Sequence, residues 1–244
     1  MKNPTDSGMN RTGIDMSPKD VQELLNSVNA PSPGSAGDGN RALSSYRTPY
    51  IKNADPIGNV PVPGTLKGAA KSGMQKLMAR KPEVLIEKLG ARLAFERTGT
   101  RLYDALLGKC QARTDESHGL SLDLLQEFRD EEARHFAIVW DAMKGMGADP
   151  TAVTPEADIN GVASIGLMQI LSDPRTSVAQ SLHAIHIAEL ADHDGWELLI
   201  QLAQEFGQED MAADFRGALV EEVRHLATIR ELMKTSCLSE AGVA

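Results

Sequence analysis

The pentad Glu-Glu-x-Arg-His occurs twice in this 244-residue chain, at residues 131–135 and at residues 221–225. Both copies lie in long segments whose apolar residues recur every three or four positions, which is the periodicity of an amphipathic helix. The second glutamate and the histidine of each pentad are three residues apart, so they share one helix face and can reach one metal ion. The repeat indicates two related pairs of helices in one chain.

Four long helices are predicted from residue 82 onward, and the chain is expected to be all-α. Only 4% of the residues are aromatic although 41% are hydrophobic, which favours a helical core over a β-sandwich or barrel. Between the second and third helices, the proline-containing residues 147–176 are predicted to hold one short helix near residues 162–171. The predicted long helices cover residues 82–112, 122–146, 177–206 and 209–233.

A carboxylate interrupts the apolar face of each long helix near its middle. An unpaired buried carboxylate costs several kcal/mol or becomes protonated. One such residue is explained by a misjudged helix face, but one on each of four helices predicts a partner that all four share. The four residues, in chain order, are Glu96, Glu132, Glu189 and Glu222.

The spacing of these residues predicts that they lie at one level. In an antiparallel pair of helices, residues at the same height are equally far from the turn. The midpoint of Glu96 and Glu132 is residue 114, and that of Glu189 and Glu222 falls beside Gly207. Both midpoints lie at predicted turns. The long segment between the second and third helices can carry the chain back along the bundle, which predicts a four-helix bundle with a single long crossover.

Four glutamates and two histidines match the ligands of two divalent metal ions, because four negative charges offset four positive ones. Bundles that hold two iron or manganese ions take one Glu from each of two helices and one Glu-x-x-His from each of the other two. Mixed oxygen and nitrogen ligands suit iron or manganese better than a structural zinc site. The predicted metal ligands are Glu96, Glu132, His135, Glu189, Glu222 and His225.

With these residues, the segment 82–236 resembles the ferritin-like superfamily, and most of all its rubrerythrin and bacterioferritin branches. The resemblance implies a ferritin-like four-helix bundle with two iron ions as cofactor, and manganese is the alternative metal. It also implies a catalytic role for Tyr103, which follows Glu96 by seven residues. Rubrerythrins carry an additional carboxylate ligand where this chain has Asp192, and His193 competes with Asp192 for that role.

The two pentads also resemble the surroundings of the metal ligands in di-iron oxygenases. By that likeness, Glu131 and Glu221 accept the second ring N–H of the ligand histidines, while Arg134 and Arg224 hold these carboxylates. The alternative is that all four are solvated surface charges.

The resemblance implies a non-haem di-iron oxidoreductase that reacts with O₂ or H₂O₂, as a peroxidase or as a ferroxidase with Fe(II) as substrate. The alternatives are an iron-binding or iron-storage protein, a di-manganese catalase-like enzyme and an enzyme that oxygenates an organic substrate. The chain has two cysteines, Cys110 and Cys237, and lacks the four-cysteine rubredoxin module of rubrerythrins. An external electron donor is therefore expected.

Charge and hydropathy set the remaining expectations. Residues 1–81 carry 11 Lys and Arg against 6 Asp and Glu, a net charge of +5, whereas residues 82–244 carry 14 against 28, a net charge of −14. An acidic body argues against nucleic acid as the main partner. No apolar run approaches 18 residues and the N-terminus lacks an apolar stretch, so neither a membrane span nor a signal peptide is expected. We expect a cytoplasmic homo-oligomer, with a dimer as the working assumption.

The N-terminal third is rich in Gly, Pro, Ser and Asn. Residues 1–64 are predicted to be mostly irregular, with one short helix at residues 18–28, and residues 65–81 are predicted to form a basic amphipathic helix. Residues 237–244 are predicted to be a C-terminal tail.

Overall fold

The computed structural model describes residues 18–29, 36–62, 68, 81–117 and 119–243, and in this part of the chain it contains seven α-helices and no strand. The predicted all-α class is confirmed. The chain divides into two compact units, Met1–Pro56 and Ile57–Ala244. The first unit contains α1 (Pro18–Asn29) and α2 (Ala36–Asn53).

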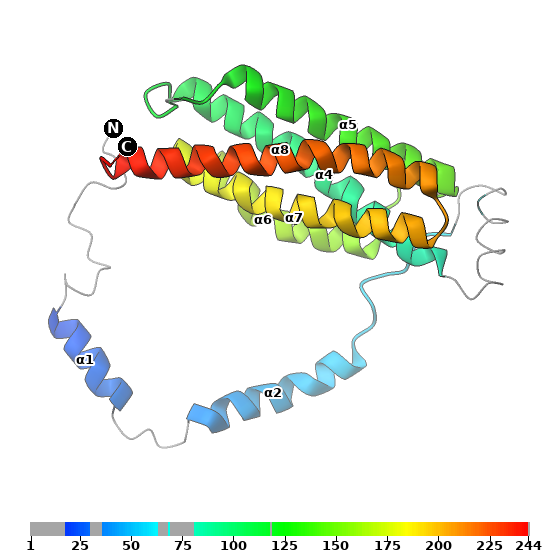
Figure 1. The fold of residues 1–244 in the computed structure, drawn as a ribbon. Helices are drawn as coiled ribbons and strands as arrows, with labels where there is room; N and C mark the ends of the chain where they lie inside the picture. The colour runs from blue at the N-terminus through cyan, green and yellow to red at the C-terminus, as the bar shows by residue number, and fades with distance from the viewer. Residues whose placement is uncertain (1–17, 30–35, 63–67, 69–80, 118, 244) are drawn as a thin grey trace. The chain divides into compact units, whose positions relative to one another are not determined.

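The helices of the second unit form what we call the helical body (Figure 1). Its four long helices surround a common interior, since α4 packs against α5 and α7, and α8 packs against α7 and α5. The shorter α6 lies against α4 and α7. The bounds are α4 (Pro82–Ala112), α5 (Leu122–Met146), α6 (Pro155–Ser172), α7 (Val178–Glu205) and α8 (Glu209–Glu240).

Local capping explains why the long helices begin and end close to their predicted bounds. The Ser121 hydroxyl accepts the Leu124 N–H at the start of α5, and Ser177 and Gln180 form a reciprocal capping box at the start of α7. Gly147 ends α5 with a φ of 80°, a left-handed conformation that favours glycine. Two bounds differ from the prediction: α6 begins at Pro155, and α8 continues to Glu240 through part of the predicted tail.

Two separate hydrophobic clusters form the interior of the helical body. One contains Leu102, Phe128 and Ile185, and the other contains Leu89, Trp196 and Phe215. On each of the four long helices, the predicted ligand residues fall in the sequence between the residues of one cluster and those of the other. The structure therefore has a polar layer enclosed by apolar side chains at both ends.

The first unit differs from its sequence prediction at α2. This helix covers residues that were predicted to be irregular. The prediction was wrong here because Gly37, Gly39 and Pro49, which disfavour a helix, dominate the local sequence. Side-chain contacts between neighbouring turns accompany the helix: the rings of Tyr46 and Tyr50 are 5.7 Å apart. In contrast, α1 covers the short helix predicted at residues 18–28. The predicted basic helix falls almost wholly on residues 63–67 and 69–80, outside the described residues.

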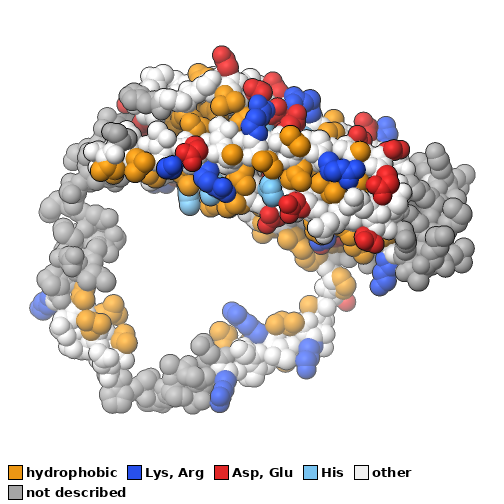
Figure 2. All heavy atoms as spheres, in the orientation of Figure 1, with side chains coloured by type: hydrophobic (Ala, Val, Ile, Leu, Met, Phe, Trp, Pro, Cys, Tyr) orange, Lys and Arg blue, Asp and Glu red, His pale blue; other side chains and the backbone are white. Residues whose placement is uncertain are grey.

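Surface side chains are mixed in character. Figure 2 shows Lys and Arg side chains interspersed with Asp and Glu side chains on the face of the helical body that carries α8. On α1, Leu24, Leu25 and Val28 are exposed. None of the described helices combines the length and the apolar character that a membrane crossing requires.

Two glycines of α4 give a matched test of the packing. A Cβ on Gly90 would lie 2.4 Å from the Thr154 hydroxyl oxygen at the start of α6, whereas a Cβ on Gly108 would meet no atom within 4 Å. We expect Gly90→Ala to lower the free energy of unfolding by about 1–3 kcal/mol, as overpacking does. Gly108→Ala should raise it by about 0.5–1 kcal/mol through helix propensity. Urea denaturation measures both, and a shift in the same direction for the two variants would contradict the described α4–α6 contact.

Candidate metal centre

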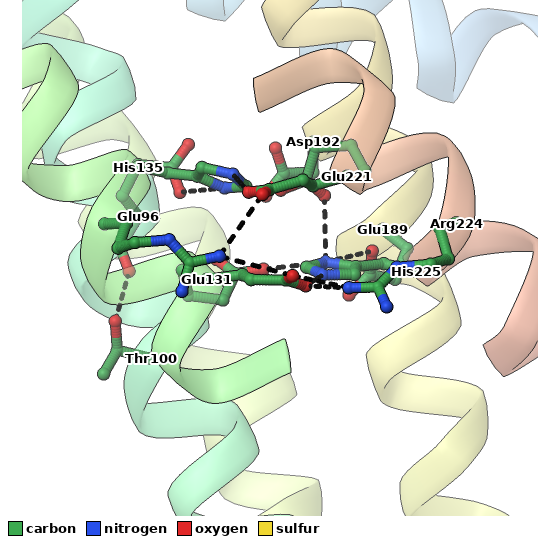
Figure 3. Close-up of polar contacts among 12 residues, drawn as sticks. Glu96, Thr100, Glu131, His135, Glu189, Asp192, Glu221, Arg224 and His225 are labelled. Atoms are coloured by element: carbon green, nitrogen blue, oxygen red, sulfur yellow. Dashed lines mark hydrogen bonds and ion pairs between the residues drawn. The ribbon is translucent and has the colours of Figure 1, made fainter. Parts of the chain in front are cut away.

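The six predicted ligand residues all lie in the polar layer, and each is at most 2% exposed. Each of the four long helices contributes: α4 and α7 one glutamate each, α5 and α8 one Glu-x-x-His each. Figure 3 shows the labelled side chains of this layer directed toward one another from the surrounding helices. The structure thus brings together Glu96, Glu132, His135, Glu189, Glu222 and His225.

The two histidines are held in the same way. His135 Nε2 lies 2.8 Å from Glu221 Oε2, and His225 Nε2 lies 2.7 Å from Glu131 Oε2 (Figure 3). Since a carboxylate can only accept, Nε2 carries the proton of each neutral ring. The lone pair of Nδ1 then faces the interior, where it is available to a metal ion.

Glu222 lies between the two rings. Its Oε1 is 2.7 Å from His135 Nδ1, and its Oε2 is 3.4 Å from His225 Nδ1. Glu96 Oε2 approaches His135 Nδ1 at 3.8 Å, and Glu132 Oε1 approaches His225 Nδ1 at 3.6 Å. Every imidazole Nδ1 of the layer therefore has at least two carboxylates around it.

Two overlapping groups of ligand atoms follow from this arrangement, and within each group the atoms lie within 4.8 Å of one another. Subsite 1 consists of Glu96, His135 and Glu222. Subsite 2 consists of Glu132, Glu189, Glu222 and His225. Glu132 also forms such a group with Glu96, Asp192 and Glu222, so Glu132 and Glu222 can serve both subsites.

The remaining pentad residues surround the histidines. Arg224 Nη2 donates to both oxygens of Glu131 at 2.5 Å, and Arg134 Nη2 lies 3.2 Å from Glu221 Oε1. The first glutamate of each pentad therefore contacts the histidine of the other pentad and is itself held by an arginine. Glu131 is buried, while Glu221 and both arginines are partly or largely exposed.

The resemblance implied roles for three further residues, and two of them, Tyr103 and Asp192, lie at the layer. The Tyr103 hydroxyl donates to Glu189 Oε1 at 2.5 Å, beside subsite 2. Asp192 is buried and faces the layer, but His193 is partly exposed, and its nearest described acidic contact is Asp194 at 3.5 Å. Of the two competing extra ligands, only Asp192 reaches the layer, where Arg92 pairs with its carboxylate.

Sequence reasoning missed one charged residue of the layer, Arg92. Its side chain is buried, with Nε 2.6 Å from Glu96 Oε1 and Nη2 2.8 Å from Asp192 Oδ1. Nη1 donates to the Asp192 carbonyl oxygen at 2.9 Å. Arg92 and Glu96 are four residues apart, which is the spacing of common surface ion pairs. The only sequence signal for burial was the neighbouring apolar stripe of Leu89 and Leu93.

Two glycines provide space for these charged groups. A Cβ on Gly99 would lie 2.0 Å from Glu132 Oε2, and a Cβ on Gly195 would lie 2.4 Å from Arg92 Nη1. Any larger residue at either position would displace a charged side chain of the layer. Both glycines therefore belong to the structure of the centre, although neither carries a reactive group.

Glu96, Glu189 and Asp192 resist ionisation in the absence of a cation. Burial raises the pKa of Glu96 and of Glu189 well above their ordinary value of 4.5, and neighbouring carboxylates add to the increase. Burial likewise raises the pKa of Asp192, although Arg92 opposes this change. Burial and the nearby Glu189 raise the pKa of Tyr103, so its hydroxyl stays protonated.

Glu222 and His225 shift toward their charged forms. Burial favours the neutral form of Glu222, but the neighbouring imidazoles of His135 and His225 outweigh it and lower its pKa to about 2. Burial also opposes the charge on His225, but Glu132 and Glu222 raise its pKa to about 11. Without a metal, a protonated histidine thus supplies positive charge next to Glu222.

The donor set fits divalent cations. Among the described residues, several buried atoms of the layer have no hydrogen-bond partner, including Glu96 Oε2, Glu132 Oε2 and both oxygens of Glu222. Both histidine Nδ1 atoms also lack one. Unpaired buried acceptors are rare in proteins, and here they converge from four helices. A cation bound among them would satisfy them together.

No protein-family model, curated protein or solved structure matches this chain. What can be said of its function therefore rests on the residues and geometry of the polar layer.

The stability of the metal-free protein is expected to fall as the pH rises from about 5 to about 8. Glu96, Glu189 and Asp192 retain protons in the folded state that the unfolded chain releases at their ordinary pKa values of 4.5 and 3.8. His225 acts in the same direction, because its stabilisation is complete below 6.5 and is lost toward about pH 11. Thermal melts with chelator test this expectation.

Bound Mn²⁺ should oppose this trend, because metal ions bind the deprotonated ligands. A melting temperature of the chelated protein that rises between pH 5 and pH 8 would contradict the burial of these carboxyl groups.

Proposed function

We propose that the helical body is a ferritin-like four-helix bundle whose single long crossover runs through α6, and that its polar layer holds two divalent metal ions. The observation that carries the proposal is the matched arrangement of the two histidines. Each has Nε2 bound to a glutamate of the opposite pentad and Nδ1 directed at buried carboxylates. In metal sites, a second ring nitrogen fixed by a carboxylate sets the tautomer and orientation of a ligand histidine.

The charges of the layer support two ions rather than one. Glu96, Glu132, Glu189 and Glu222 together carry four negative charges when ionised, which two divalent ions would neutralise. Asp192 and Arg92 neutralise each other. Oxygen and imidazole donors with no thiolate favour iron, and manganese is the alternative.

We further propose that the protein is a non-haem di-iron oxidoreductase, a peroxidase or ferroxidase that acts on O₂ or H₂O₂. Two Fe(II) ions, held by the glutamates and histidines of the layer, would supply two electrons to such an oxidant and become two Fe(III) ions. The four long helices hold the side chains that would bind the ions. Apolar clusters close both ends of the layer and so limit the access of water to it. Tyr103 keeps a proton at its hydroxyl oxygen beside Glu189, where it can be donated within subsite 2.

Reduction of the centre would require an external electron donor, since the chain has two cysteines and lacks the four of a rubredoxin module. The two cysteines do not form a disulfide: Cys110 is buried and Cys237 is exposed.

Metal analysis tests the centre itself. The full chain, loaded anaerobically with Fe(II) and desalted, should contain about two iron ions per chain. We expect His135→Ala and His225→Ala each to reduce this content to about one, because each removes the nitrogen ligand of one subsite. Glu222→Ala should reduce it further, because Glu222 belongs to both subsites.

His183→Ala is the matched control, since His183 is an exposed histidine of α7 outside the layer. Equal iron contents in the wild type, His135→Ala and His225→Ala would contradict the proposed centre.

The reaction is tested by mixing the Fe(II)-loaded protein with O₂ or H₂O₂ and recording the near-ultraviolet absorbance of the oxidised iron. We expect the bound Fe(II) to be oxidised within seconds of mixing, which a stopped-flow spectrophotometer can follow. Tyr103→Phe should keep the iron content and slow oxidation by about 10²-fold or more, as expected when a positioned proton donor is lost. An unchanged rate would exclude a catalytic role for Tyr103.

The same experiment separates the alternatives. Accumulation of iron far beyond two ions per chain would indicate storage. Disproportionation of H₂O₂ by the Mn(II)-loaded protein would indicate a catalase-like enzyme. A failure of O₂ and H₂O₂ to oxidise the bound Fe(II) would contradict the proposed oxidoreductase.

A further inference from the structure

The two halves of the centre are related by a simple correspondence between α4 and α7. Tyr103 follows Glu96 by seven residues, and Trp196 follows Glu189 by seven. The Tyr103 ring lies edge-on to His225 with centroids 6.1 Å apart, and the Trp196 ring lies edge-on to His135 at 5.6 Å. Each helix thus supplies one glutamate and, two turns later, one aromatic ring that packs on a histidine.

The correspondence does not extend to two charged residues near the glutamates, and both of them lie beside the same subsite. Four residues before the glutamate, α4 has Arg92 where α7 has the apolar Ile185. Three residues after the glutamate, α7 has Asp192 where α4 has Gly99. Arg92 and Asp192 form an ion pair beside Glu96, so subsite 1 carries a charged pair that subsite 2 lacks.

Arg92 is rigidly held rather than simply buried. Its guanidinium makes three polar contacts of 2.6–2.9 Å with Glu96 and Asp192, and it lies 4.5 Å from the Phe95 ring centroid and 5.2 Å from that of Trp196. The absence of a side chain at Gly195 gives Nη1 its space. Burial opposes the charge on Arg92, but the nearby Asp192 and Glu96 outweigh it and leave the pKa of Arg92 raised, so the guanidinium stays protonated.

This contact takes one of the two Glu96 oxygens. Glu96 Oε1 is bound by Arg92, and only Oε2 faces His135. In subsite 2, the corresponding Glu189 oxygen accepts a hydrogen bond from a neutral hydroxyl, that of Tyr103. An ion at subsite 1 must therefore share its carboxylate with a fixed cation, in a buried setting where charges are weakly screened.

Arg92 also lines a cavity of about 180 Å³ between α4, α6 and α7, whose polar lining includes Lys88, Glu156 and Asn160. The same guanidinium therefore contacts both this cavity and Glu96 of subsite 1.

We propose that Arg92 makes the two subsites unequal: subsite 2 fills first and tightly, and subsite 1 binds the second ion at least tenfold more weakly. This inference rests on the proposed two-metal centre and adds an order of loading to it. Arg92 is a positioning residue in this scheme, since it acts through Glu96 and Asp192.

The test is a calorimetric titration of the metal-free full chain with Co²⁺. For the wild type we expect two steps whose dissociation constants differ by tenfold or more. The double variant Arg92→Met/Asp192→Asn removes the ion pair without changing the net charge and frees both Glu96 oxygens. Its two dissociation constants should lie within about threefold of each other.

Lys88→Met is the matched control. Lys88 lies one turn before Arg92 on α4, lines the same cavity and pairs with Glu156 at 2.5 Å, away from the polar layer. The same loss of a cation there should leave the tenfold difference unchanged. A narrowed difference in Lys88→Met equal to that in the double variant would overturn the role of Arg92.

Two further variants identify the tight subsite. His135→Gln should retain the tight step, whereas His225→Gln should lose it. The reverse result overturns the proposal, and this test remains decisive if circular dichroism shows that the double variant does not fold.

Two outcomes concern the wild type alone. Two Co²⁺ ions bound with equal affinity would overturn the inequality and leave the metal centre standing. No Co²⁺ binding at all would overturn the metal centre together with it.

Discussion

Every level of this structure depends on how charge is compensated inside the helical body. Six carboxyl groups are buried in or beside one layer. Burial of an isolated carboxylate destabilises the folded state by more free energy than one contact between helices contributes. Among the residues that the structure describes, the buried cations around them are Arg92 and the two histidines when protonated. The buried carboxyl groups are those of Glu96, Glu131, Glu132, Glu189, Asp192 and Glu222. The pKa increases of Glu96 and Glu189 show how incomplete this compensation is without a bound cation.

The apolar clusters above and below the layer make this arrangement tolerable. They contribute the burial of apolar surface that offsets the polar layer, and they fix the four long helices on both sides of it. Side chains that ligate a metal must be held to within a fraction of an ångström, and sites on packed helices achieve this better than sites on loops. The clearances at Gly99 and Gly195 belong to the same design, since they let charged groups enter an otherwise close-packed interior.

Much of this layer could be predicted from the sequence, because the helix repeat and the pentad repeat each place residues on faces. The bounds of α4 and α5 follow from apolar periodicity and capping residues, and the same periodicity places Glu96 and Glu189 inward. The sequence predicted that Glu131 and Glu221 bind the ligand histidines, but it does not show which glutamate meets which histidine.

Other features lay beyond such reasoning. Arg92 and Glu96 have the spacing of an ordinary exposed ion pair, so the burial of Arg92 depends on the space that Gly195 provides on another helix. Asp192 and His193 both lie about one turn after Glu189, so the sequence does not show which of them is buried, and the choice depends on the contact of Asp192 with Arg92 from another helix. In α2, glycines and Pro49 conceal a helical segment, because propensity describes single residues and not the contacts between them.

The pairing of the two pentads has a consequence for which amino-acid substitutions such a centre can acquire. Each half supplies the glutamate that orients the other half's imidazole, so the two hairpins α4–α5 and α7–α8 resemble two subunits joined by a tether. In an assembly of two identical hairpins, any substitution would appear on both sides of the symmetry axis, and an arginine gained by one half would be gained by its mate. Joining the halves in one polypeptide removes that restriction. A solitary guanidinium on one side is a feature that only the covalently joined arrangement permits.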